Sequence, residues 1–225
     1  MKLYADPIST TCRPILLFAA ETGADLKVEF IDLFKGANQS PEYAKINPNC
    51  QVPCLDDGDF RLTESSAILK YLADKANSPL YPKDLKQRAH VNQMMDWFNT
   101  GFYHTFGYDF VYPQILDHLK FKEPVAQAAL LNFGREHAKK CLAVLNDHWL
   151  GSDSKFLCGN EITIADYFGA CLITAGEVAH VDLSPWPNVA RWLRNVKALP
   201  SWGRVNEPFY QRFVGAFKDA PMEKF

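Results

Sequence analysis

Short hydrophobic runs with two different periods alternate along the first third of the chain. Alternating or β-branched runs predict strands at 2–4, 27–32, 51–55 and 60–63. Apolar runs predict helices at 14–20 and 67–72, and a further short helix fits the polar stretch from Pro41. The segment Asp56-Asp57-Gly58-Asp59 predicts a hairpin turn between the last two strands. The order βαβ followed by ββα predicts a small α/β domain at residues 1–77.

Beyond residue 86 the apolar positions recur at steps of three and four, which is the helical period. Asparagine, serine, proline and charged residues predict a linker at 78–86, and residues 87–225 are predicted to form an all-helical domain. Helical patterns cover 86–118, 126–149, 188–198 and 204–217, and another begins at Thr163. Asp166, three residues after Thr163, predicts a variant capping box at that helix start. The predicted fold class is therefore α/β plus all-α.

Composition and charge exclude several classes of protein. The 225 residues are 48% hydrophobic and 22% charged with a formal net charge of -2, which is close to ordinary globular usage. Basic residues are scattered among acidic ones, so we expect no nucleic-acid partner. No run approaches the roughly 20 apolar residues of a membrane helix, and none resembles a signal peptide. We therefore expect no membrane partner and a cytoplasmic location.

The cysteines and histidines do not have the spacing of a metal site. The six cysteines are expected to be reduced thiols, because nothing in the chain points to an oxidising compartment. No two cysteines have C-x-x-C spacing, and the six histidines show no H-E-x-x-H or comparable pattern. We expect no metal ion.

The segment Ser9-Thr10-Thr11-Cys12 carries the first candidate chemistry. It lies between the first strand and the first helix, where helix N–H groups and the helix dipole favour an anion such as a thiolate. A thioredoxin-like domain has C-x-x-C at this place, but here Ser9 takes the solvent-facing position and Cys12 the usually buried one. The Ser9 hydroxyl can donate a hydrogen bond to a thiolate on a bound ligand and lower its pKa. The alternative is that Ser9 is only a loop or cap residue.

Two further segments complete a candidate ligand site. Pro53 stands where a cis bond can occur, and such a bond would leave the Val52 backbone free to pair with an extended peptide. Glu64 and Ser65 precede a helix, where they offer amide N–H groups and a hydroxyl to a carboxylate and one carboxylate to an amine. Taken alone, each segment is also an ordinary turn or helix cap. Together the three segments predict a site for a small zwitterionic peptide that bears a thiol.

Four motifs in order resemble the cytosolic glutathione transferases of the theta/delta-like serine class. They are S-x-x-C-R at 9–13, N-P-x-x-x-V-P at 47–53, T-E-S-S-A-I at 63–68 and G-x-x-x-T-x-A-D at 159–166. The resemblance spans nearly the whole chain. It implies a thioredoxin-like N-terminal domain, a C-terminal helical bundle, glutathione as co-substrate without a tightly bound cofactor, and a homodimer.

The resemblance also implies roles for individual residues. Ser9 resembles the catalytic serine that stabilises the glutathione thiolate, and Val52 resembles the residue that pairs with the cysteinyl backbone. Asn38 and Cys50 stand where delta-like members often have histidines that contact the glycyl end. The expected glutathione-binding residues are Arg13, Asn38, Cys50, Gln51, Val52, Pro53, Glu64 and Ser65.

The aromatic-rich helix predicts where a second substrate binds. Tyr103, Phe106 and Phe110 fall at i, i+3 and i+7, so on an α-helix they share a face and can line an electrophile pocket between the domains. Such a stripe is also typical of a packed core. The sequence thus predicts a glutathione transferase that adds the glutathione thiolate to a small hydrophobic electrophile, with dehalogenation and peroxide reduction as further outcomes. The alternatives are a thiol–disulfide oxidoreductase that uses Cys12 and a binding module without turnover.

Overall fold

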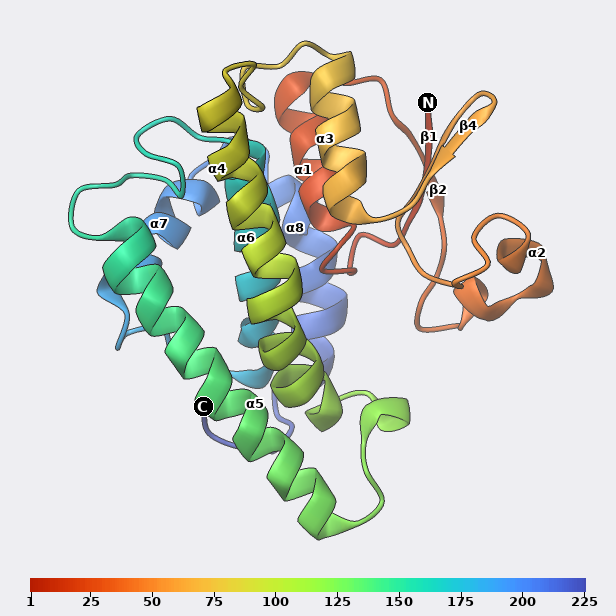
Figure 1. Cartoon of the computed structure of the whole chain (residues 1–225). Coiled ribbons are helices and arrows are strands. Elements are labelled where there is room, and N and C mark those ends of the chain that lie inside the picture. Colours follow the sequence, from red (N-terminus) through yellow and green to blue (C-terminus); the bar gives the residue numbers. More distant parts are fainter.

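Four short strands form a single sheet in the computed structural model, which describes every residue from 1 to 225 (Figure 1). They are β1 (Lys2–Ala5), β2 (Lys27–Phe30), β3 (Cys54–Asp57) and β4 (Phe60–Leu62). The sheet order is β2-β1-β3-β4, with β1 and β2 parallel and the other two pairs antiparallel. Leu3 on β1 pairs with Val28 on one side and with the buried Leu55 on the other, so β1 and β3 form the centre of the sheet.

Two helices lie between the sheet and the rest of the molecule. α1 (Arg13–Thr22) and α3 (Ser65–Lys75) pack against each other there (Figure 1). α1 ends as predicted at Gly23, whose left-handed φ of 69° carries no steric penalty for glycine. The short helices η1 (Ala37–Gln39) and α2 (Pro41–Ala44) lie in the connection between β2 and β3. This half of the chain therefore has the predicted thioredoxin-like order of elements.

The chain from residue 85 onward is built of helices, several of which contain π-helical turns. The first long helix comprises α4 (Leu85–Asp96), the π segments η2 (Trp97–Phe102) and η3 (His104–Val111), and η4 (Tyr112–Gln114). The others are η5 (Asp117–Leu119), α5 (Pro124–Val144), η6 (Leu145–Leu150), α6 (Ile164–Ile173), η7 (Thr174–Ala179), α7 (Pro187–Lys197), α8 (Trp202–Pro208), η8 (Phe209–Val214) and η9 (Gly215–Phe217). All ten residues of α6 are buried, because α4 and α7 pack against it from the helical side and α1 and α3 from the sheet side.

One apolar core runs through both halves of the chain. Its 52 buried residues include strand residues of the sheet and most of α6, so the two halves share packing rather than merely touching. α1 contacts both α6 and α8 across the junction. All six cysteines are free, as expected. No helix is both long enough and apolar enough to cross a membrane.

Candidate active site

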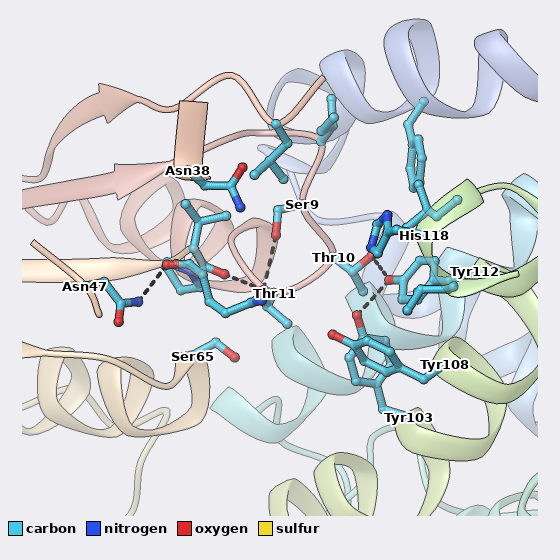
Figure 2. Close-up of a pocket in the computed structure, with 18 of the residues that line it drawn as sticks. Ser9, Thr10, Thr11, Asn38, Asn47, Ser65, Tyr103, Tyr108, Tyr112 and His118 are labelled. Carbon is cyan, nitrogen blue, oxygen red and sulfur yellow. Dashed lines mark hydrogen bonds between the residues drawn. The ribbon is translucent and has the colours of Figure 1, made fainter. Parts of the chain in front are cut away.

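A cleft of about 900 Å³ opens between the loops at one end of the sheet and the first long helix of the helical half (Figure 2). The loop after β1, the loop before β3 and the start of α3 form its one wall. The π-helical segment η3 and the η4 and η5 turns form the opposite wall. Three of the motifs that are far apart in the sequence therefore meet at one cavity.

Ser9 lies in this cleft within a small network of hydroxyl groups. Its Oγ is 3.1 Å from the Oγ1 of Thr11, and the Thr11 hydroxyl donates to the carbonyl oxygen of Val52, also at 3.1 Å (Figure 2). Because a hydroxyl has a single proton and Thr11 gives its proton to Val52, Ser9 is the donor to Thr11. The backbone N–H of Cys12 approaches the Ser9 oxygen at 3.4 Å. Ser9 thus presents a hydroxyl donor at the start of α1.

Cys12 occupies the opposite side of the same turn. Its side chain is fully buried, and this desolvation raises the pKa of the thiol to about 12, outweighing the lowering effect of the Ser9 hydrogen bond. A thiol in this environment stays protonated at neutral pH, whereas thiol–disulfide exchange requires the thiolate. The buried position predicted for Cys12 is confirmed, and it argues against an oxidoreductase that uses this cysteine.

The segment before β3 presents backbone groups to the cleft. The Val52–Pro53 bond is cis, and the Val52 N–H has no acceptor within the protein. The carbonyl oxygen of Gln51 accepts from the Asn47 side chain at 2.7 Å and from the Tyr43 hydroxyl at 2.8 Å, which fixes the segment from behind. The Gln51 side chain is left exposed at the cleft.

Asn38 and Cys50 are joined by a hydrogen bond but contribute differently. The Asn38 amide donates to the carbonyl oxygen of Cys50 at 2.7 Å, and Asn38 lines the cleft. Cys50 has a left-handed φ of 53° and does not line the cleft, since its Sγ approaches the carbonyl of Pro48 instead. The structure therefore brings Asn38 to the site and leaves the Cys50 side chain beside it.

Glu64 and Ser65 stand at the N-terminus of α3. Small polar side chains were expected to cap this helix, but no side chain caps it; the N-cap is Glu64, with a left-handed φ of 65°. A non-glycine residue in this region is strained, and such strain often occurs at ligand sites. The N–H groups of the first turn of α3 consequently have no side-chain acceptor, as at helix ends that bind anions.

Arg13 is the predicted glutathione-binding residue that the structure places elsewhere. Its side chain is fully buried beneath the cleft, where its guanidinium donates to Thr174, Asn206 and the carbonyl of Cys171 at 2.7–3.0 Å. The guanidinium carbon also lies 3.7 Å from the centre of the Phe209 ring. The prediction was wrong because Arg13 is the first residue of α1, on the side of the helix that packs against the helical half.

Of the three aromatic residues predicted to line the electrophile pocket, the structure brings one to the cleft. Tyr103 lines the cleft, but Phe106 and Phe110 are fully buried and pack against Phe225 behind it. Sequence reasoning assumed an α-helical period, whereas this segment is π-helical and each turn takes in an additional residue. Residues at positions i, i+5 and i+9 then lie on the same face of the helix. The residues that accompany Tyr103 in the cleft are therefore Tyr108 and Tyr112.

Sequence reasoning also missed polar residues on both walls. Thr10 and Thr11 join Ser9 on one wall, and Asn99, His104 and His118 join the tyrosines on the other. The hydroxyls adjacent to Ser9 in the sequence were a signal that the motif comparison passed over. The tyrosines are uncharged, since burial raises the pKa of Tyr112 to about 12 and raises the pKa of Tyr103 well above its usual value.

Comparison with known proteins gives one consistent family. Residues 1–74 match the family model described as glutathione S-transferase, N-terminal domain, and residues 122–195 match glutathione S-transferase, C-terminal domain. The chain is 37% identical over 202 residues to human glutathione S-transferase theta-2, covering 88% of this chain and 81% of that protein.

Two solved structures have the same architecture. A delta-class glutathione transferase from Nilaparvata lugens superposes with a TM-score of 0.83 at 34% identity, over 96% of this chain and 98% of that one. Human glutathione transferase theta-2, solved in complex with glutathione and an unknown ligand, superposes with a TM-score of 0.84 at 29% identity, over 100% and 93% of the two chains. The chain belongs to the glutathione S-transferase family.

Proposed function

We propose that this protein binds glutathione in the cleft and uses the Ser9 hydroxyl to hold the glutathione thiol as a thiolate for attack on a small hydrophobic electrophile. The observation that carries the proposal is the position of Ser9, a hydroxyl donor in the cleft within two hydrogen bonds of the Val52 backbone. Support also comes from the relative that was solved with glutathione bound.

The free backbone groups of the cleft suit the three parts of glutathione. The unpartnered N–H of Val52 pairs with the cysteinyl carbonyl, as in the addition of a strand. The γ-glutamyl carboxylate meets Ser65 and the uncapped first turn of α3, and its amine meets the Glu64 carboxylate. Gln51 and Asn38 lie at the glycyl end. This arrangement directs the cysteinyl thiol toward Ser9.

The proposed chemistry needs a hydrogen-bond donor to the thiolate and an electrophile bound close to it. Glutathione loses its thiol proton to solvent, and the Ser9 hydroxyl turns from Thr11 to donate to the resulting thiolate. Such a bond stabilises only the charged form, and each unit by which it lowers the thiol pKa corresponds to about 1.4 kcal/mol. The electrophile binds against Tyr103 and Tyr108, so the thiolate attacks a neighbour that is already in place.

Two other functions are less consistent with the site. Disulfide exchange through Cys12 conflicts with its complete burial and with its pKa of about 12. A binding module without turnover would keep the cleft but would not activate the thiol.

We also propose that the protein is a homodimer, on the resemblance alone, so its mass in solution is expected to be twice the 25.5 kDa of one chain.

The first experiment is a pH titration of the ultraviolet thiolate absorbance of protein-bound glutathione in the wild type and in Ser9→Ala. We expect the wild type to lower the pKa of the bound thiol below that of free glutathione, because Ser9 donates only to the thiolate. We expect Ser9→Ala to raise this pKa again by about one unit or more and to reduce turnover about tenfold or more.

A matched control is Ser152→Ala, which removes an exposed hydroxyl that bonds only its neighbour Asp153, and this variant should behave as the wild type. Bound glutathione with an unshifted pKa in both wild type and Ser9→Ala would contradict the serine mechanism. Bound glutathione without turnover of any electrophile would favour the binding module.

A further inference from the structure

Three hydroxyl groups form a continuous chain that joins the tyrosine wall of the cleft to the loop after β1. The Tyr103 hydroxyl lies 2.7 Å from that of Tyr112, and the Tyr112 hydroxyl donates to the Oγ1 of Thr10 at 2.8 Å (Figure 2). All three side chains line the cleft, yet Thr10 is only 4% exposed and the two tyrosines 7% each. The chain is therefore buried except at its edge on the cavity.

The direction of the hydrogen bonds in this chain follows from counting protons. Tyr112 gives its only proton to Thr10, so the contact between the tyrosines uses the proton of Tyr103. All the O–H bonds then point the same way, from Tyr103 through Tyr112 to Thr10. The Thr10 hydroxyl keeps its own proton, and no atom of the protein accepts it. A buried donor without an acceptor is unfavourable unless a ligand or a water molecule accepts its hydrogen bond.

The close approach of the two tyrosines depends on a glycine. A Cβ atom at Gly107 would stand 2.9 Å from the Tyr103 ring and 3.3 Å from the Tyr112 ring, closer than side chains normally pack. The absence of a side chain at position 107 therefore lets both rings approach and lets their hydroxyls meet. Burial keeps both phenols protonated, since it raises the pKa of Tyr112 to about 12 and raises the pKa of Tyr103 well above its usual value. The chain thus stays a donor across the neutral pH range.

We propose that Thr10 binds, by donating a hydrogen bond, the oxygen atom of an electrophile on which negative charge develops as the glutathione thiolate attacks. Tyr112 and Tyr103 act as positioning residues, because each donated bond polarises the next hydroxyl and strengthens the donor at the end of the chain. The inference rests on the proposed function. It names the class of the second substrate: an electrophile with an oxygen atom that takes up the negative charge as the thiolate attacks, of which conjugated carbonyl compounds are the representative.

The reaction with a conjugated aldehyde shows where this donor acts. The thiolate forms a bond to the β-carbon, and the electron pair of the carbon–carbon double bond shifts to give an enolate whose oxygen bears the charge. Thr10 donates to that oxygen. A proton from solvent, equivalent to the one that the thiol lost, then adds to the α-carbon and restores the carbonyl. In a reaction with an alkyl halide the charge leaves on the halide, which is a weaker hydrogen-bond acceptor than an enolate oxygen.

The test compares crotonaldehyde with butyl iodide, which have four-carbon chains of similar size. Thr10→Val keeps the shape of the side chain and removes the hydroxyl. We expect it to lower kcat/KM for crotonaldehyde about tenfold or more and to leave kcat/KM for butyl iodide within about twofold. Tyr112→Phe should lower the crotonaldehyde value by a smaller factor, about threefold, and Tyr103→Phe by less again, because each acts only through its neighbour.

Matched controls remove hydroxyls that lie outside the chain. Tyr81→Phe loses a part-buried hydroxyl that donates to Asn92, and Thr105→Val loses one that donates to carbonyl groups of its own helix. Both should keep the wild-type ratio of the two activities. Equal losses for both electrophiles in Thr10→Val, or no loss for crotonaldehyde, would overturn the inference.

Binding of two glutathione derivatives gives a readout that does not need turnover. Glutathione sulfonate places anionic oxygens at the sulfur position, and S-methylglutathione places a methyl group there. Measured by calorimetry, Thr10→Val should lower the affinity for glutathione sulfonate at least about fivefold and leave the affinity for S-methylglutathione unchanged. If both derivatives bind the wild type and Thr10→Val weakens them alike, this inference fails and the proposed function stands. If neither derivative binds the wild type, the proposed function fails and the inference falls with it.

Discussion

Ser9 and Cys12 stand three positions apart, yet the fold gives them opposite environments. The turn into α1 places the Ser9 hydroxyl in the cleft and the Cys12 thiol in the core. The first group is partly exposed and has a polar neighbour in Thr11, whereas desolvation suppresses ionisation of the second. Residue type and burial together therefore decide which of the two can take part in chemistry with a thiol ligand.

The thiol of Cys12 is expected to resist alkylation in the folded protein. Its pKa is raised to about 12, so it loses its proton only as the pH rises toward that value, and at pH 8 only about one molecule in ten thousand carries the thiolate. Iodoacetamide at pH 8 should modify the partly exposed Cys50 and leave Cys12 intact. Peptide mass spectrometry measures both sites, and denatured protein, in which both react, is the control. Alkylation of Cys12 as fast as Cys50 in the folded protein would revive the oxidoreductase hypothesis.

Helix α6 shows how one buried carboxylate organises an element. The Asp166 carboxylate accepts from the backbone N–H of Thr163 and the Thr163 side chain accepts from the backbone N–H of Asp166, which together form the predicted capping box; the Thr163 hydroxyl also approaches the carboxylate at 3.1 Å. Asp166 also accepts from the N–H of Leu157 and from the indole N–H of Trp192, both at 2.8 Å. The carboxylate therefore caps α6 and at the same time fixes the preceding loop and α7. The sequence motif predicted the first of these functions only.

The two carboxylate caps of the helical half should differ in their contribution to stability. Asp84 caps α4 at the surface by accepting from two backbone N–H groups, so Asp84→Ala should lower the free energy of unfolding by about 1 kcal/mol. Asp166→Ala leaves several donors buried without an acceptor and should lower it by about 3 kcal/mol or more. Urea denaturation of the two variants measures the difference. Similar losses for both would show that the additional bonds of Asp166 contribute little.

At the scale of the whole molecule, Arg13 ties the sheet half to the helical half. It is a buried charge without a carboxylate partner. Its two Nη atoms donate to Thr174, Asn206 and the Cys171 carbonyl, and the guanidinium lies over the face of Phe209, whereas its buried Nε has no hydrogen-bond partner. These partners come from α6, η7, α8 and η8, so a single side chain contacts four helical elements. The fixed position of α1 in turn fixes the loop that carries Ser9.

Replacement of Arg13 should therefore destabilise the whole molecule rather than weaken glutathione binding directly. Arg13→Leu leaves the buried Asn206 side-chain oxygen without its donor and removes one of the hydrogen bonds to the Cys171 carbonyl, and we expect the free energy of unfolding to fall by about 2–4 kcal/mol. Arg204→Leu, which removes an exposed arginine from α8, is the control and should change stability by less than about 0.5 kcal/mol. A stable Arg13→Leu variant with a much weaker affinity for glutathione would contradict this assignment.

Local patterns were sufficient to predict most of the elements and the class of fold. The period of apolar positions, Gly23 as a helix end, the turn at Gly58 and the Thr163–Asp166 box act over a few residues, so their outcome is encoded where they stand. The four motifs were sufficient to indicate the family, which the comparisons confirm. The placement of Ser9, Val52, Glu64 and Ser65 around one cleft also agrees with the geometry.

Only the tertiary structure decided which side of each element faces the cleft. The Arg13 side chain lies in the junction of the two halves because packing against α6 and α8 fixes the rotation of α1 about its own axis. Phe106 and Phe110 turned into the core because π-helical turns change the period that relates sequence to surface. The hydroxyl chain that ends at Thr10 joins residues about a hundred positions apart. The sequence determined the elements and the chemical groups they carry, since those depend on neighbouring residues, and packing between distant segments decided which groups meet.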